Sequence, residues 1–193
     1  MPDHLPDSLF PPREGELDPV RGFLGCLMTC PAHRARELLA GMRPTDAGPG
    51  IRGVVVELIL TVVAAGIDPD PRVLLGEARR RGLLDTEDRH KQFAHWIFET
   101  HQFAPYPEAG ARLKADVLES ALRWAVAEHA QRLLTAAAHA SLTDLHTLVD
   151  LDDDLVDLWH RTENELRAWD REPAPEQVVR PAPEQPSTNR RAA

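Results

Sequence analysis

Apolar residues recur at helical spacing through the first half of the chain. Between Leu17 and residue 106 they form five short runs, each bounded by a proline, a glycine or a capping residue such as Asp18, Asp70 or Thr86. The positions expected to face inward are Val20, Phe23, Leu24, Leu27 and Met28; Ala35, Leu38, Leu39 and Met42; Ile51, Val55, Leu58, Ile59 and Val62; Leu74, Leu75 and Ala78; and Phe93, Trp96 and Ile97. No run shows the alternation of period two that a half-buried strand requires. The pattern therefore predicts an all-α fold that begins with a small globular helical bundle.

A longer helical pattern follows this bundle. From Pro107 to about His139 the only glycine is Gly110 and there is no further proline, which predicts one helix of about 48 Å at 1.5 Å per residue. Its apolar stripe consists of Leu113, Val117, Ala121, Trp124 and Leu133. The segment 141–144 fits a capping box and predicts a second long helix. The apolar positions of that helix are Leu145, Leu148, Val149, Leu155, Val156 and Trp159.

Two long helices joined by a short link form an αα-hairpin. Because neither helix is expected to be stable alone in water, the pair must bury its stripes against itself or against a partner. Five of the 17 prolines precede residue 20 and five more follow Arg171, so both ends are expected to be disordered. We therefore predict a disordered segment at 1–16, a globular head at 17–106, a hairpin at 107–170 and a disordered proline-rich tail at 171–193.

The net charge of −9 is concentrated in the predicted folded part. Residues 1–15 carry about −2 and the residues from Arg171 onward carry about +1, which leaves about −8 on the middle of the chain. An acidic domain is repelled by phosphate backbones, so direct nucleic-acid binding is disfavoured. The longest apolar stretch, 54–65, is interrupted by Glu57 and is too short to span a membrane. With no secretory signal at the N-terminus and two cysteines, we expect a cytoplasmic protein with reduced thiols.

The order and spacing of several segments resemble the N-terminal domain of the DnaB-type replicative helicases. The first segment matches that family's opening helix at Val20, Leu24, Gly25, Leu27 and Met28. The sequence Met-Arg-Pro-Thr-Asp at 42–46 is similar to the family's Leu-Arg-Pro-Glu-Asp turn, and Arg52 stands where the family often has His-Arg before an apolar helix. Residues 109–133, with Ala-Leu-Arg at 121–123, resemble the helix that enters the family's hairpin. The resemblance covers roughly residues 17 to 168.

The chain departs from the family pattern at three places, and we therefore expect a divergent, standalone member without the ATPase domain. Ala47 replaces an aromatic residue after the turn, Gly22 weakens the first helix, and 106–109 replaces the family's Asn-Val segment. A P-loop requires Gly-x(4)-Gly-Lys-Ser/Thr, and the chain contains no Gly-Lys dipeptide. We therefore expect no ATPase activity, no enzymatic activity and no cofactor.

The resemblance implies a module that builds a hexameric collar, in which hairpins pair between subunits and the collar binds a primase or a loader. The expected function is therefore non-catalytic protein–protein interaction in DNA replication. The expected partners are further copies of the chain and a replicative helicase, its primase or its helicase loader. The expected interface consists of Leu145, Leu148, Val149, Leu155, Val156 and Trp159.

Three clusters suggest site chemistry, and each has a simpler interpretation. Cys26, Cys30 and His33 lack the fourth ligand that a structural zinc needs, so we expect two semi-buried thiols and a surface histidine. The histidines His90, His95 and His101 lack the spacing of a metalloprotease and have no nucleophile beside them. The aspartates at 150 and 152–154 lack the glycine and glutamate of a calcium loop. They fit a solvated helix face, or a face toward a basic partner, and we expect no metal site.

The alternative function is a small DNA-binding or regulatory helical protein. A helix that enters a DNA groove usually carries clustered basic residues. The only compact basic run is Arg79, Arg80 and Arg81, which solvation of a helix end near Gly82 explains at least as well.

Overall fold

The computed structural model describes residues 18–141 and 153–171. These residues are helical or lie in turns, and none of them is in a β-strand, so the all-α fold class is confirmed. The predicted disordered segments 1–16 and 171–193 lie outside the described residues except for Arg171, which ends the last helix. The capping box at 141–144 beyond Ser141 and the positions Leu145, Leu148 and Val149 also lie outside them.

The head begins with α1 (Pro19–Thr29), α2 (Ala32–Leu39) and a short 3₁₀ helix, η2 (Pro44–Ala47). It continues with α3 (Ile51–Ala64), α4 (Pro71–Arg80) and α5 (Glu87–Gln102). The predicted caps are confirmed. The Asp18 carboxylate accepts from the backbone amides of Val20 and Arg21, and Asp70 and Thr86 cap α4 and α5 in the same way.

The core of the head forms around α1, which contacts α2, α3, α5 and α6. Most of the inward positions predicted from the sequence are buried in one cluster. Ile51, Leu75 and Trp96 differ, because they pack against the edge of that cluster and are only partly buried. Where α1 meets α5 the backbones are very close: a Cβ atom at Gly25 would lie 2.8 Å from the carbonyl oxygen of Thr100.

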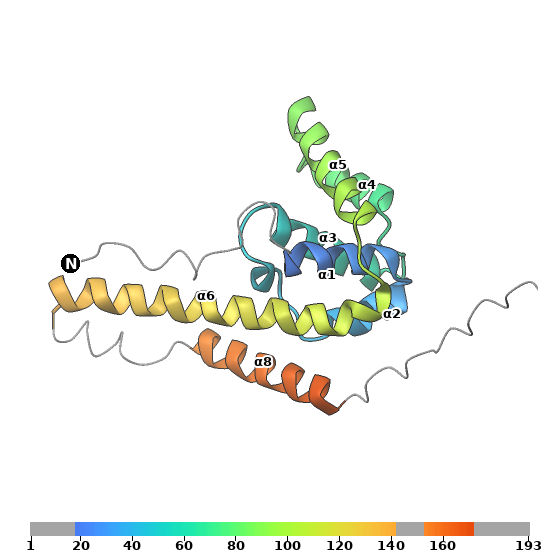
Figure 1. Cartoon of the computed structure of the whole chain (residues 1–193). Coiled ribbons are helices and arrows are strands. Elements are labelled where there is room, and N and C mark those ends of the chain that lie inside the picture. Colours follow the sequence, from blue (N-terminus) through green and yellow to red (C-terminus); the bar gives the residue numbers. More distant parts are fainter. Residues whose placement is uncertain (1–17, 142–152, 172–193) are drawn as a thin grey trace, which may run out of the picture.

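A second 3₁₀ helix, η3 (Pro107–Ala109), leads into α6 (Gly110–His139), which is followed by α8 (Asp153–Arg171). In Figure 1 α6 extends well past the head, and α8 lies beside it. The core cluster crosses from the head into these helices through Val117, Leu118 and Leu158. The boundary at residues 106 and 107 therefore stays a prediction, since one continuous core spans it.

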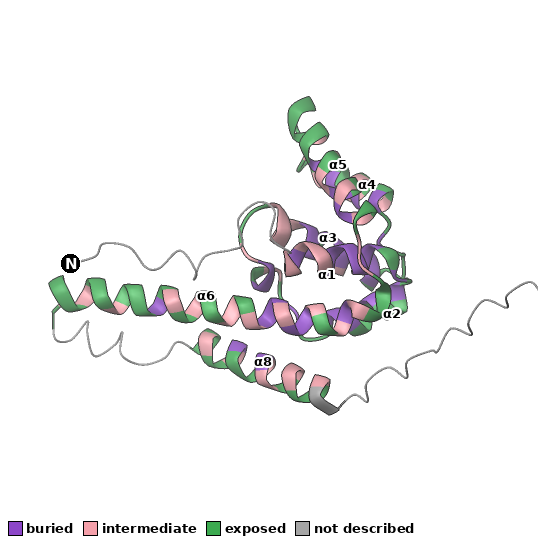
Figure 2. Ribbon diagram, viewed as in Figure 1, coloured by how far each residue is buried: buried purple, intermediate pink, exposed green. Residues whose placement is uncertain are grey.

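Burial along α6 decreases beyond its middle. Figure 2 shows buried positions mainly in the half of α6 nearest the head and mostly exposed positions toward its far end. Trp124, which we expected on the buried stripe, is 41% exposed. It lies on the same side of α6 as Leu113 and Val117 at about 100° per residue. The difference arises because Leu113 and Val117 pack against the head, whereas Trp124 lies two turns farther along the helix.

Candidate interaction surface of the helical hairpin

The side of α8 that faces the rest of the protein has little apolar character. Among its described side chains, Leu158 and Thr162 are buried. The Thr162 hydroxyl donates to the carbonyl oxygen of Leu158 at 2.8 Å and reaches that of Leu118 at 3.4 Å. Burying one leucine contributes roughly 1.5–3 kcal/mol. Partly buried Leu155, Leu166 and Trp169 add to this packing, and the Arg112 guanidinium of α6 lies 5.4 Å from the centre of the Trp169 ring.

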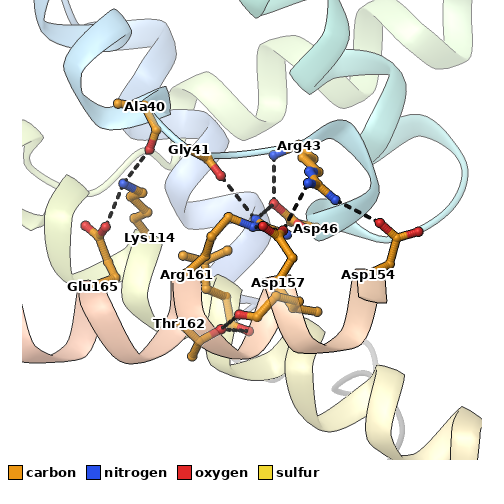
Figure 3. A network of polar contacts seen from close by, with 12 residues as sticks. Ala40, Gly41, Arg43, Asp46, Lys114, Asp154, Asp157, Arg161, Thr162 and Glu165 are labelled. Carbon is orange, nitrogen blue, oxygen red and sulfur yellow. Dashed lines mark hydrogen bonds and ion pairs between the residues drawn. The ribbon is translucent and has the colours of Figure 1, made fainter. Parts of the chain in front are cut away.

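An ion pair joins α8 to the turn that contains η2. Arg161 lies on α8, and its two terminal nitrogens bind the two carboxylate oxygens of Asp46 at 2.6 and 3.1 Å (Figure 3). The Asp46 side chain is 3% exposed, and it also accepts from the backbone amide of Arg43 at 2.7 Å. A bidentate ion pair of this kind fixes both the distance between the two side chains and their relative orientation. Asp46 thus closes the turn and anchors α8.

Further polar contacts flank this pair. Arg43 contacts Asp157 at 3.0 Å and Asp154 at 3.2 Å, so part of the predicted acidic run faces a basic residue of the same chain. Lys114 of α6 binds Glu165 at 2.7 Å and donates to the carbonyl oxygen of Ala40 at 2.9 Å (Figure 3). The hydrogen bond from Arg161 holds the pKa of Asp157 below its usual range, so this carboxylate stays charged into the acid range. We call the contacts of Arg43, Asp46, Asp154, Asp157 and Arg161 the ionic clamp.

The side of α8 away from Arg161 carries exposed apolar residues. Trp159 is 55% exposed and Val156 is 37% exposed, while Leu155 is partly buried between them and the contact with α6. On α6, Val126 is 45% exposed. We call Val126, Val156 and Trp159 the outer face. Single exposed apolar residues are ordinary, but a contiguous patch often marks an interaction site.

Three of the six interface residues predicted from the sequence, Leu155, Val156 and Trp159, are described. Val156 and Trp159 are exposed, whereas Leu155 is partly buried and lies on the same side of the helix as Leu158, three residues farther on. Sequence reasoning missed Leu158, which lies at the contact with α6. The signal that could have found it is the spacing of Leu158, Thr162 and Glu165, which places these residues on one side of the helix. The assignment of the six residues to an interface stays a prediction.

Both cysteines are fully buried, which corrects the expectation of semi-buried thiols. Cys26 turns inward because α1 is enclosed on most sides, and its sulfur donates weakly to the carbonyl oxygens of Pro105 and Tyr106. Burial raises the pKa of the Cys26 thiol to about 11, and burial also raises the pKa of Cys30. His33 is exposed, as expected.

We expect both thiols to be inert in the folded protein. With a pKa of about 11, only about one Cys26 in a thousand is a thiolate at pH 8, and the thiolate is the reactive form. A chromogenic disulfide reagent should therefore label the native protein at least tenfold more slowly than the protein in guanidinium chloride. Rapid labelling of the native protein would show that α1 opens readily.

The other clusters do not assemble into sites. His90 and His101 are eleven residues apart on α5, or about 16 Å at 1.5 Å per residue, and the His95 side chain is largely exposed and lies 3.7 Å from Glu99. No group of three or more potential metal ligands is gathered among residues 18–141 and 153–171. Within the same ranges, no helix has the length and apolar character needed to cross a membrane.

The basic run at the end of α4 is engaged within the protein. Arg80 and Arg81 both contact Glu77, at 2.6 and 2.8 Å, and Arg81 also contacts Glu57 of α3 at 2.8 Å. Hydrogen bonds from these two arginines lower the pKa of Glu77 to about 2. Two of the three arginines thus have carboxylate partners on α4 or α3, which weakens the case for phosphate binding.

Comparison with known proteins identifies the fold. No family model matches the chain, and no curated protein sequence matches it. Among solved structures, the chain is similar to the crystal structure of the N-terminal domain of DnaB helicase from Mycobacterium tuberculosis. The match has a TM-score of 0.57 at 20% sequence identity and covers 82% of this chain and 99% of the other. The protein therefore has a DnaB N-terminal-like all-α fold.

Proposed function

We propose that the protein is a non-catalytic module that assembles through its helical hairpin and acts by protein–protein contact in DNA replication. Its partners would be further copies of the chain and a replicative helicase, the primase or the helicase loader, in the cytoplasm. The proposal is supported by the similarity in fold to the N-terminal domain of a helicase. It is also supported by the resemblance at residues 42–46, whose Asp46 anchors the hairpin.

The observation that carries the proposal is the outer face. Val126 leaves exposed apolar surface on α6, and Val156 and Trp159 leave it on α8, about 140–160° around the helix from Arg161 at 100° per residue. A second copy that presents the same face would cover this surface symmetrically, which is the commonest arrangement in homo-oligomers. The described residues give no specific support to the DNA-binding alternative, because Arg80 and Arg81 are paired with carboxylates.

Light scattering coupled to gel filtration tests this function. At tens of micromolar, an order of magnitude chosen from affinity arithmetic, the purified protein should have at least the mass of a dimer. Mixing with the replicative helicase of the same organism should give a larger complex or redistribute the oligomers. A strict monomer that does not associate with the helicase, its primase or its loader would rule out the proposal.

A further inference from the structure

Few residues of α8 are fully buried. α1 buries seven residues, whereas the described part of α8 buries only Leu158 and Thr162. Regions with few buried apolar contacts open at a lower free energy than the core of a domain. Among the described helices of eight or more residues, α8 has the smallest fraction of fully buried apolar residues, which favours its separate opening.

The contacts between α8 and the turn that contains η2 are charged, and they oppose this release together with the packing on α6. Arg161 donates to both oxygens of Asp46 and, at 3.1 Å, to the carbonyl oxygen of Gly41, so its guanidinium is bound to the head at three acceptors. Its Nε also donates to Asp157 on its own helix at 2.8 Å. Figure 3 shows these contacts and those of Arg43 meeting between α8 and the turn. Because Asp46 is buried, removing Arg161 leaves a carboxylate without its charged partner.

We infer that α8 is a detachable element, that the ionic clamp sets whether it is docked, and that its release breaks up the outer face. The second part rests on the proposed function. Val156 and Trp159 lie on α8, whereas Val126 lies on α6. Release of α8 would change the position of Val156 and Trp159 relative to α6, so the clamp would control assembly through the position of this helix.

The clamp residues on the head, Arg43 and Asp46, can hold their positions while α8 docks and leaves. Asp46 is held by the turn itself, since the Arg43 backbone amide donates to it and η2 packs against α3. The anchor therefore remains in position when α8 leaves. Arg43 contributes from the same turn, and its side chain and that of Asp157 are both exposed enough for salt to screen the pair. Release of α8 should thus respond to ionic strength.

Hydrogen exchange measured by mass spectrometry on the full chain tests the inference. In dilute wild-type protein, peptides from α8 should exchange faster than those from α1 and α3. Arg161→Met should raise α8 exchange at least tenfold and leave α1 and α3 unchanged. Asp46→Asn removes the carboxylate of the same ion pair and should also raise α8 exchange. Arg123→Met is the matched control, because Arg123 is exposed and its ion pair with Glu119 lies within α6.

Assembly is read on the same variants by light scattering. Arg161→Met should raise the concentration needed for assembly at least tenfold, although the variant leaves the outer face chemically intact. Unchanged α8 exchange, or exchange that rises equally in α1 and α3, would overturn the detachable element. If Arg161→Met speeds α8 exchange but leaves assembly unchanged, the ionic clamp does not control assembly. A wild-type protein that is always monomeric would refute the proposed function. The exchange data would then test only whether the ionic clamp holds α8 against the rest of the protein.

Discussion

Gly25→Ala should destabilise the protein by about 3 kcal/mol, near the upper end for overpacking a core. The new Cβ atom would lie 2.8 Å from the carbonyl oxygen of Thr100 and 3.0 Å from the Cα atom of Ala104. Both are backbone atoms, so no flexible side chain can move away and α1 must separate from α5. Thermal unfolding followed by circular dichroism should show a melting temperature lower by roughly 10 °C.

Gly22→Ala is the matched control on the same helix. A Cβ atom there would meet only side-chain atoms, the nearest being Cδ2 of Leu113 at 3.5 Å, which is ordinary contact. Since alanine is favoured over glycine inside a helix by about 1 kcal/mol, this variant should be neutral or slightly more stable. Equal destabilisation by both substitutions would contradict the close approach of α1 and α5 at Gly25.

The two glycines also show what the sequence can and cannot reveal. From the sequence Gly22 was a weakness of the first helix and Gly25 only a match to a family pattern. The reason for a glycine at position 25 is a contact with residues 100 and 104, far away in the chain. Local signals predicted the helices well, because caps such as Asp18 and Thr86 act within a few residues.

Long-range polar contacts explain what sequence reasoning missed at the candidate site. Arg161 and Asp46 are 115 positions apart, and nothing in either local sequence marks them as partners. The apolar pattern from residue 145 onward predicts a helix, and its described part, α8, is helical. The assignment of the stripe through Trp159 to an interface stays a prediction. Leu158 lies outside that stripe, because the buried side of α8 combines Leu158 with the polar residue Thr162.

Trp159→Ala should weaken assembly by about 2 kcal/mol or more, or roughly 30-fold in the dissociation constant. Aromatic anchors often dominate the energy of an interface, and the indole ring of Trp159 is the largest side chain of the outer face. Because 55% of this residue is exposed, the free energy of unfolding of the monomer should change by less than about 1 kcal/mol. Sedimentation across a concentration series measures the dissociation constant of assembly, and denaturant unfolding of dilute protein measures the free energy of unfolding.

Phe103→Ala provides the control for removing an exposed aromatic ring. Phe103 is also largely exposed, but it follows α5 on the head and does not belong to the outer face. Assembly weakened equally by both variants would place the contact on the head as well as the hairpin. Lower stability with unchanged assembly in Trp159→Ala would mean that the ring packs within one chain. Weaker assembly with unchanged stability, in Trp159→Ala alone, is the result that assigns the outer face of the hairpin to a partner.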